Sequence, residues 1–175
     1  MLKRIPPDAL CMDALCAAAG VGKGTLYRRF VDKAALLRAL LDEDERALQE
    51  DVRLSFSASA RGAEARRQLL VLLEKLHAFV MDHAELLGAA EASGKPAVIL
   101  ESPPYAWRRS VIATLLERSD VPPAKASYFA DMLMASMAGE IIMRALRGQD
   151  RELVKRAARV FYEGVLAGTL AFVRS

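Results

Sequence analysis

The chain has 175 residues, 53% of them hydrophobic, and a formal net charge of +3. This composition is typical of one or two small packed domains and excludes an intrinsically disordered chain. Charged residues interrupt every long apolar run, so no membrane span is predicted, and the first ten residues lack the apolar stretch of a secretion signal. Cys11 and Cys16 are the only cysteines, which excludes a disulfide framework and indicates a cytoplasmic protein.

Helical patterns follow one another along the chain, and no segment alternates as a strand would. Gly20 and Gly148 are predicted helix stops, and Asp32 a predicted N-cap. The sequence therefore predicts an all-α fold, with a helix-turn-helix segment over residues 1–45 and a helical domain over 46–175. The predicted helices are Met12–Ala19, Lys23–Phe30, Lys33–Arg53, Ala63–Asp82, Ala84–Ala92, Pro104–Arg118, Pro123–Leu146 and Arg151–Val173.

Charge is distributed unevenly between these two parts. Residues 1–41 carry a net charge of +4, and the rest of the chain carries −1. A local basic patch suggests a polyanionic partner, although a solvated basic face would have the same charge. The acidic run DEDERALQED, residues 42–51, is predicted to be a solvent-facing helix surface.

The stretch GVGKGT, residues 20–25, has the composition of a phosphate-binding loop. Such a loop requires glycine at position 17 and serine or threonine after the lysine, in a turn between a strand and a helix. The chain has Ala17 and Gly24 at those positions and a helical pattern before them, so a nucleotide loop is excluded. A helix-turn-helix fits better, with a short helix, a turn at Gly20 and a second helix that opens with polar residues.

In this interpretation Lys23, Thr25, Arg28 and Arg29 face outward, and Val21, Leu26 and Phe30 face inward. Gly24 allows the backbone to approach a DNA groove closely, and Lys33 can reach a flanking phosphate.

The segment MDALCAAAGVGKGTLYRRFVDKAALLRALL, residues 12–41, resembles the DNA-binding segment of the TetR/AcrR family of one-component bacterial repressors. The resemblance implies operator contacts by Thr25, Tyr27 and Lys33, with Lys23, Gly24, Arg28 and Arg29 on surrounding groove-facing positions. It also implies that the helical remainder binds a ligand and dimerises. The family has a full first helix before this segment, whereas Pro6-Pro7 disfavours one here, so we expect that helix to be missing. Either the chain is shortened relative to what its gene encodes, or the protein binds DNA poorly.

The last two predicted helices carry the features of a dimer interface. A heptad-like seam and two glycines one turn apart predict a tightly crossing neighbour, and the preceding helix is apolar on nearly all sides. Two such helices from each of two chains would form a four-helix interface; burial of both within a monomer is the alternative. The candidate interface residues are Phe129, Met132, Val154, Ala158, Phe161, Gly164, Val165, Gly168 and Phe172.

A ligand pocket is predicted between the middle helices, where few charges fall, so we expect a small lipophilic effector. An ordinary core would have the same composition. The candidate lining residues are Leu72, Leu76, Phe79, Trp107, Val111, Phe129, Leu133 and Met137.

No residue pattern indicates a metal site, a cofactor or an enzyme, because His77, His83, Cys11 and Cys16 lack partners at ligand spacing. The sequence therefore predicts a homodimeric transcriptional regulator that binds double-stranded DNA at a palindromic operator, most simply a repressor released by its effector. The alternative is a helical small-molecule-binding or scaffold dimer that does not bind DNA because its first helix is absent.

Overall fold

The computed structural model describes residue 16 and residues 22–30, 33–93 and 100–174, and within these ranges it contains helices and no strand. The predicted all-α fold is confirmed. Of the predicted helix Met12–Ala19 only Cys16 is described, and the predicted cap Asp32 lies outside the described residues. The helices are α2 (Lys23–Arg29), α3 (Lys33–Ser55), α4 (Gly62–Asp82), α5 (Ala84–Ser93), α7 (Pro103–Glu117), α8 (Pro123–Ala135), α9 (Gly139–Leu146) and α10 (Arg151–Arg174).

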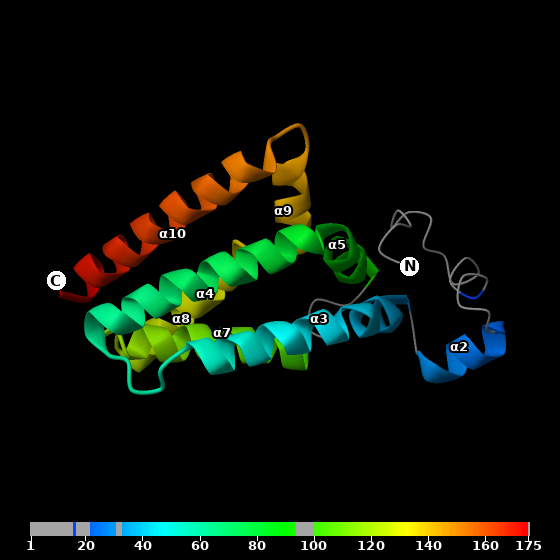
Figure 1. The fold of residues 1–175 in the computed structure, drawn as a ribbon, viewed down its shortest axis with the longest axis horizontal. Helices are drawn as coiled ribbons and strands as arrows, with labels where there is room; N and C mark the ends of the chain where they lie inside the picture. The colour runs from blue at the N-terminus through cyan, green and yellow to red at the C-terminus, as the bar shows by residue number, and fades with distance from the viewer. Residues whose placement is uncertain (1–15, 17–21, 31–32, 94–99, 175) are drawn as a thin grey trace.

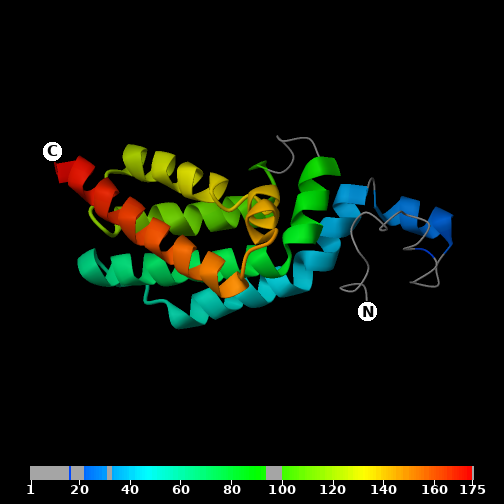
Figure 2. The same cartoon turned by 90° about the horizontal axis from the view of Figure 1, so that it is seen from above.

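The helices form an elongated bundle with α2 at one end and the C-terminal end of α10 at the other (Figure 1). Helices α3 and α4 run antiparallel along the long axis, and α10 lies across α4. Seen from above, α7 and α8 pair on one side of α4 (Figure 2). The short α9 packs against α5. Helix α3 therefore spans the distance between the α2 end and the bundle.

The core is built around the apolar stripe of α4. Leu69, Leu72, Leu73 and Leu76 recur at helical spacing and are buried. They pack in one cluster with apolar residues of α7 and α8, among them Ile112, Leu115, Leu116, Ala130 and Leu133. Each buried leucine contributes about 2 kcal/mol of transfer free energy, so this stripe is a main source of stability.

Turn chemistry sets the helix ends. Pro103 lies in the first turn of α7, where a missing N–H costs nothing. The helix ends in a Schellman motif: Val121 N donates to Leu116 O at 3.1 Å, and Asp120 adopts a positive φ of 73°. Gly148 has φ 72° two residues after the end of α9 at Leu146, which confirms its predicted role as a helix stop.

One predicted helix is wrong. The single helix expected over Pro123–Leu146 is broken into α8 and α9, with Ala138 extended at φ −57° and ψ 136°. The break brings Gly139 against α5. A Cβ at Gly139 would lie 2.9 Å from both Gly88 N and Leu87 Cβ, a distance that real Cβ atoms essentially never reach. This close helix contact, which periodicity cannot show, determines where α9 starts.

Candidate nucleic-acid interface

Helix α2 presents polar and basic groups at the end of the molecule. Thr25 N donates to Gly22 O at 2.9 Å in the first turn, and the last turn carries Arg28 and Arg29, which suit the negative end of the helix dipole. Thr25, Arg28 and Arg29 are exposed, as predicted for outward-facing residues. Phe30 is half-buried, and the Arg29 guanidinium lies 5.7 Å from its ring centroid.

The other predicted contact residues have a known backbone position only. Lys23 opens α2, Tyr27 lies within it and Lys33 opens α3, but their side chains lie outside the described residues. Gly24 is exposed, and nothing lies within 4 Å of the position that a Cβ would take there. The open space at Gly24 is compatible with a close approach to DNA. DNA contact by Lys23, Gly24, Tyr27 and Lys33 stays a prediction.

Helix α3 links this basic end to the bundle. It is one continuous helix of 23 residues, about 34 Å long, and it starts three residues after Phe30. Its C-terminal half packs within the bundle, where Val52 is buried in the core. Helix α3 therefore reaches from the α2 end of the molecule into the core of the bundle.

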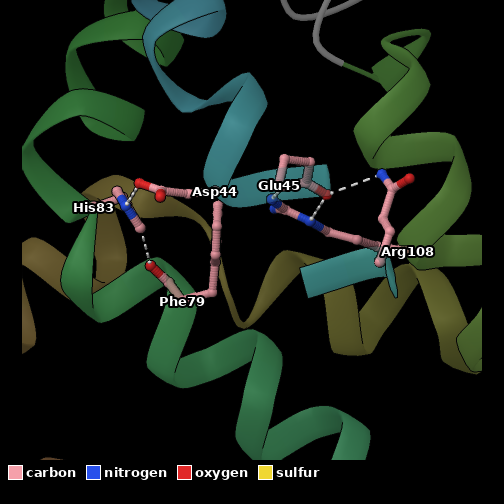
Figure 3. A network of polar contacts seen from close by, with 6 residues as sticks. Asp44, Glu45, Phe79, His83 and Arg108 are labelled. Atoms are coloured by element: carbon pink, nitrogen blue, oxygen red, sulfur yellow. Dashed lines mark hydrogen bonds and ion pairs between the residues drawn. The ribbon is translucent and has the colours of Figure 1, made fainter. Parts of the chain in front are cut away.

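A buried ion pair fixes α3 to α7. Glu45 of α3 accepts two hydrogen bonds from the Arg108 guanidinium: Nε lies 3.2 Å from Oε1, and Nη2 contacts Oε2 (Figure 3). The two side chains are only 4% and 12% exposed. The guanidinium carbon also lies 4.9 Å from the centroid of the Phe79 ring. Because a buried charge is costly without its partner, these contacts restrain the relative position of the two helices.

A second polar contact fixes α3 to the α4–α5 junction. His83 Nε2 lies 2.9 Å from Asp44 Oδ2, and Nδ1 lies 2.9 Å from Phe79 O (Figure 3). Both partners are hydrogen-bond acceptors, so the ring satisfies both when both of its nitrogens are protonated. Asp44 and Glu45 are neighbours on α3 and bind different helices, which gives two points of attachment.

The acidic run was predicted to face solvent, and for Asp44 and Glu45 that prediction is wrong. Glu45 is buried and Asp44 half-buried, because α7 and the start of α5 cover this part of α3. Asp42, Glu43 and Arg46 remain exposed, in agreement with the prediction. Only an expected pairing with Arg108 or His83, each far along the chain, could have identified the two buried acids.

The residues of the predicted ligand pocket lie in or against the core. Leu72, Leu76, Phe79, Leu133 and Met137 are buried, and Trp107, Val111 and Phe129 pack partly buried against them. A hollow of about 370 Å³ lies elsewhere, between α4 and α10, and none of these eight residues lines it. The role of the core residues as ligand contacts stays a prediction.

The predicted dimer residues divide into two groups. Met132, Phe161 and Phe172 are exposed, together with Gly164 and Gly168. Phe129, Val154, Ala158 and Val165 are partly buried against their own core. Nothing in the described chain lies within 4 Å of a Cβ at Gly164 or Gly168, so no described helix crosses closely there, and the expected tight neighbour stays a prediction.

The part of the chain that the structure describes contains no cluster that could hold a metal ion and no helix that could span a membrane. Among the described side chains, no three of the His, Cys, Asp and Glu type come together in a cluster that could hold a metal ion. Within residues 22–30, 33–93 and 100–174, no helix combines the length and the apolar character needed to span a membrane.

Comparison with known proteins agrees with the geometry of α2 and α3. Residues 2–40 match the sequence model of the bacterial regulatory proteins of the tetR family. The match begins ten residues before Met12, where the signature noted in the sequence starts, and ends within α3. No curated protein matches the chain significantly. The exposed basic helix and the matched segment, residues 2–40, together support a DNA-binding regulator of the TetR type.

Proposed function

We propose that the protein is a homodimeric, ligand-responsive regulator that binds a palindromic operator and releases it when an effector binds, and so acts as a repressor. The observation that supports this best is the arrangement of α2 and α3. An exposed basic helix is joined to a long helix that Glu45 and Asp44 attach to the bundle at two points. A rearrangement of the bundle can therefore be transmitted to the DNA-binding end.

The mechanism is a shift between two conformations. In one, α3 holds α2 in position for a DNA groove; in the other, α3 is tilted and the two α2 helices of a dimer no longer match their half-sites. An effector that binds the second conformation more tightly than the first lowers the affinity for DNA. The size of this decrease is limited by the difference between the two effector affinities. We expect a small, predominantly lipophilic effector, in keeping with the apolar residues between the middle helices.

Dimerisation is supported by exposed apolar side chains on two neighbouring helices. Tyr128 and Met132 of α8 and Phe161 and Phe172 of α10 are between 49% and 61% exposed. Apolar residues grouped in this way are typical of a protein interface. A two-fold arrangement of α8 and α10 would cover them and would place two α2 helices on one duplex.

DNA binding is tested by its dependence on salt, which requires no knowledge of the operator. Binding of a mixed-sequence duplex, measured by fluorescence anisotropy, is expected to weaken as salt rises, because lysine and arginine displace counterions from phosphates. Lys33→Ala is expected to reduce the slope of log affinity against log salt by about one unit.

Arg144→Ala is the control, since Arg144 is an exposed cation on α9, away from α2. An unchanged slope in Lys33→Ala would contradict the phosphate contact. Failure of the wild-type protein to bind any duplex would instead favour a helical small-molecule-binding or scaffold dimer.

A further inference from the structure

A groove between α4 and α10 has the features of a binding site. Its volume is about 370 Å³, within the usual range for small-molecule sites. Helix α4 contributes His77 and Ala78, and α10 contributes Ala158 and Tyr162. The two alanines give the groove apolar walls, and the two aromatic side chains bring polar atoms to it.

His77 has an unsatisfied ring nitrogen. The residue is only 6% exposed, and its Nδ1 lies 2.9 Å from Tyr162 Oη. Its Nε2 is buried without a hydrogen-bond partner among the described residues. Buried polar groups are almost always paired, so an unpaired nitrogen in the wall of a groove indicates a group that binds there. When Tyr162 donates its hydroxyl proton to Nδ1, Nε2 carries a hydrogen and seeks an acceptor.

The rim of the groove is basic, and one of its cations has no ion pair among the described residues. Lys155 Nζ lies 2.7 Å from Glu152 Oε1, and the Arg159 guanidinium lies 3.0 Å from Glu163 Oε1. Arg159 also lies 3.3 Å from Glu74, the one acidic residue that lines the groove.

Arg156 lines the same groove and has no ion pair within the part of the chain that the structure describes. Among the described residues the groove therefore offers the buried His77 Nε2 without a hydrogen bond and the Arg156 cation without an ion pair. Glu74 Oε1 also lacks a hydrogen bond among these residues, but it faces the Arg159 cation.

We propose that this groove binds a small organic anion, such as an aromatic carboxylate. The carboxylate pairs with Arg156 at the rim and accepts a hydrogen bond from His77 Nε2, while the apolar body lies along Ala78 and Ala158. An inorganic anion would leave the apolar walls uncovered, and a neutral apolar molecule would leave the Arg156 guanidinium and His77 Nε2 unpaired.

The groove differs from the predicted core pocket, because none of the apolar core residues between the middle helices lines it. It shares Ala158 with the candidate dimer interface, whereas Phe161 and Phe172 of that interface do not line it. Binding in the groove is independent of DNA. Only the coupling of that binding to operator release rests on the proposed function.

The experiment is a calorimetric titration of the full chain at fixed ionic strength with benzoate, its neutral isostere benzamide, and inorganic phosphate. Benzoate is expected to bind at least tenfold more tightly than either of the other two. Arg156→Gln is expected to weaken benzoate binding about fivefold, as loss of a partly exposed ion pair does. Arg144→Gln is the matched control, since it removes the same charge from α9, outside the groove, and is expected to leave the affinity unchanged.

A second variant tests the buried nitrogen. His77→Asn keeps a polar atom near the position of Nδ1 and removes Nε2, so it is expected to weaken benzoate binding also. If this variant fails to fold, the comparison of benzoate affinities between Arg156→Gln and Arg144→Gln decides whether benzoate binds in the groove.

Three outcomes would overturn the proposal: no binding of benzoate, equal binding of phosphate and benzoate, or equal affinities in the two arginine variants. Because the titration contains no DNA, a protein that fails to bind DNA can still show the site. Binding of benzoate without any change in DNA affinity would confirm the site and exclude its coupling to the operator.

Discussion

At the scale of single residues, the contact between His77 and Tyr162 joins α4 to α10 inside the bundle. The two groups lie 2.9 Å apart, and both are buried. Burial lowers the pKa of His77 and raises the pKa of Tyr162 to about 12, since in each case it disfavours the charged form. Both side chains are therefore neutral near pH 7, and the contact is a neutral hydrogen bond.

The lowered pKa of His77 predicts a loss of stability in acid. Below about pH 6.5 the unfolded chain takes up a proton on this histidine and the folded chain does not, so protonation favours unfolding. The free energy of unfolding is expected to fall with decreasing pH, by at most about 1.4 kcal/mol per pH unit from this group. Urea unfolding between pH 8 and pH 5 measures the effect.

His77→Asn supplies the comparison, because asparagine does not titrate. The variant is expected to be less stable than the wild type at pH 8 and to lose less stability on going to pH 5. If the free energy of unfolding falls equally with pH in the wild type and in His77→Asn, then His77 titrates alike in the folded and unfolded chains.

Other residues show what a sequence can reveal at this scale. The exposure of Thr25, Arg28 and Arg29 could be predicted, because one helix turn with alternating polar and apolar residues determines it. The burial of Glu45 could not, because it depends on Arg108, 63 residues further along the chain. A charged residue is buried only where its partner is present, and the partner is a property of the tertiary fold.

At the scale of elements, apolar periodicity predicted most helices to within a residue or two, since one buried face is enough to define a helix. It failed over Pro123–Leu146 because both α8 and α9 are apolar and the pattern continues across the break. The break follows from the contact of α9 with α5, where Gly139 meets Gly88 and Leu87.

This contact predicts that Gly139→Ala destabilises the protein, although alanine is the better helix former. The new Cβ would lie 2.9 Å from Gly88 N and 3.1 Å from Leu87 C, and these backbone atoms cannot move aside as a flexible side chain can. The expected loss is about 1–3 kcal/mol, the usual cost of overpacking. Thermal or urea unfolding measures it.

Gly164→Ala is the control for this prediction. Gly164 also lies in a helix, but no atom of the described chain lies within 4 Å of its Cβ position. In a monomer this substitution is expected to stabilise α10 by about 1 kcal/mol through helix propensity alone. Equal changes in the free energy of unfolding for Gly139→Ala and Gly164→Ala would show that the α5–α9 contact leaves room for a Cβ at Gly139.

At the scale of the whole molecule, the exposed apolar face of α8 and α10 is the main feature that a single chain leaves unexplained. Two mid-helix glycines in α10 lower helix propensity, and within the described chain no close neighbour compensates for them. Close packing against a second copy would account for both the glycines and the exposed Phe161 and Phe172. The sequence could predict which helices carry this face, but an isolated chain cannot show its partner.

Gly168→Leu is expected to convert the proposed dimer into a monomer, because a large side chain at the proposed helix crossing would keep the two backbones apart. Sedimentation velocity measures the change in mass, and DNA affinity is expected to fall with it, since one chain reads only one half-site. The substitution is expected to leave the fold intact, because no atom of the described residues lies within 4 Å of the Cβ position at Gly168. Ala47→Leu, at an exposed position of α3, adds the same apolar group and is expected to remain dimeric. A Gly168→Leu protein that sediments as a dimer would place the interface elsewhere.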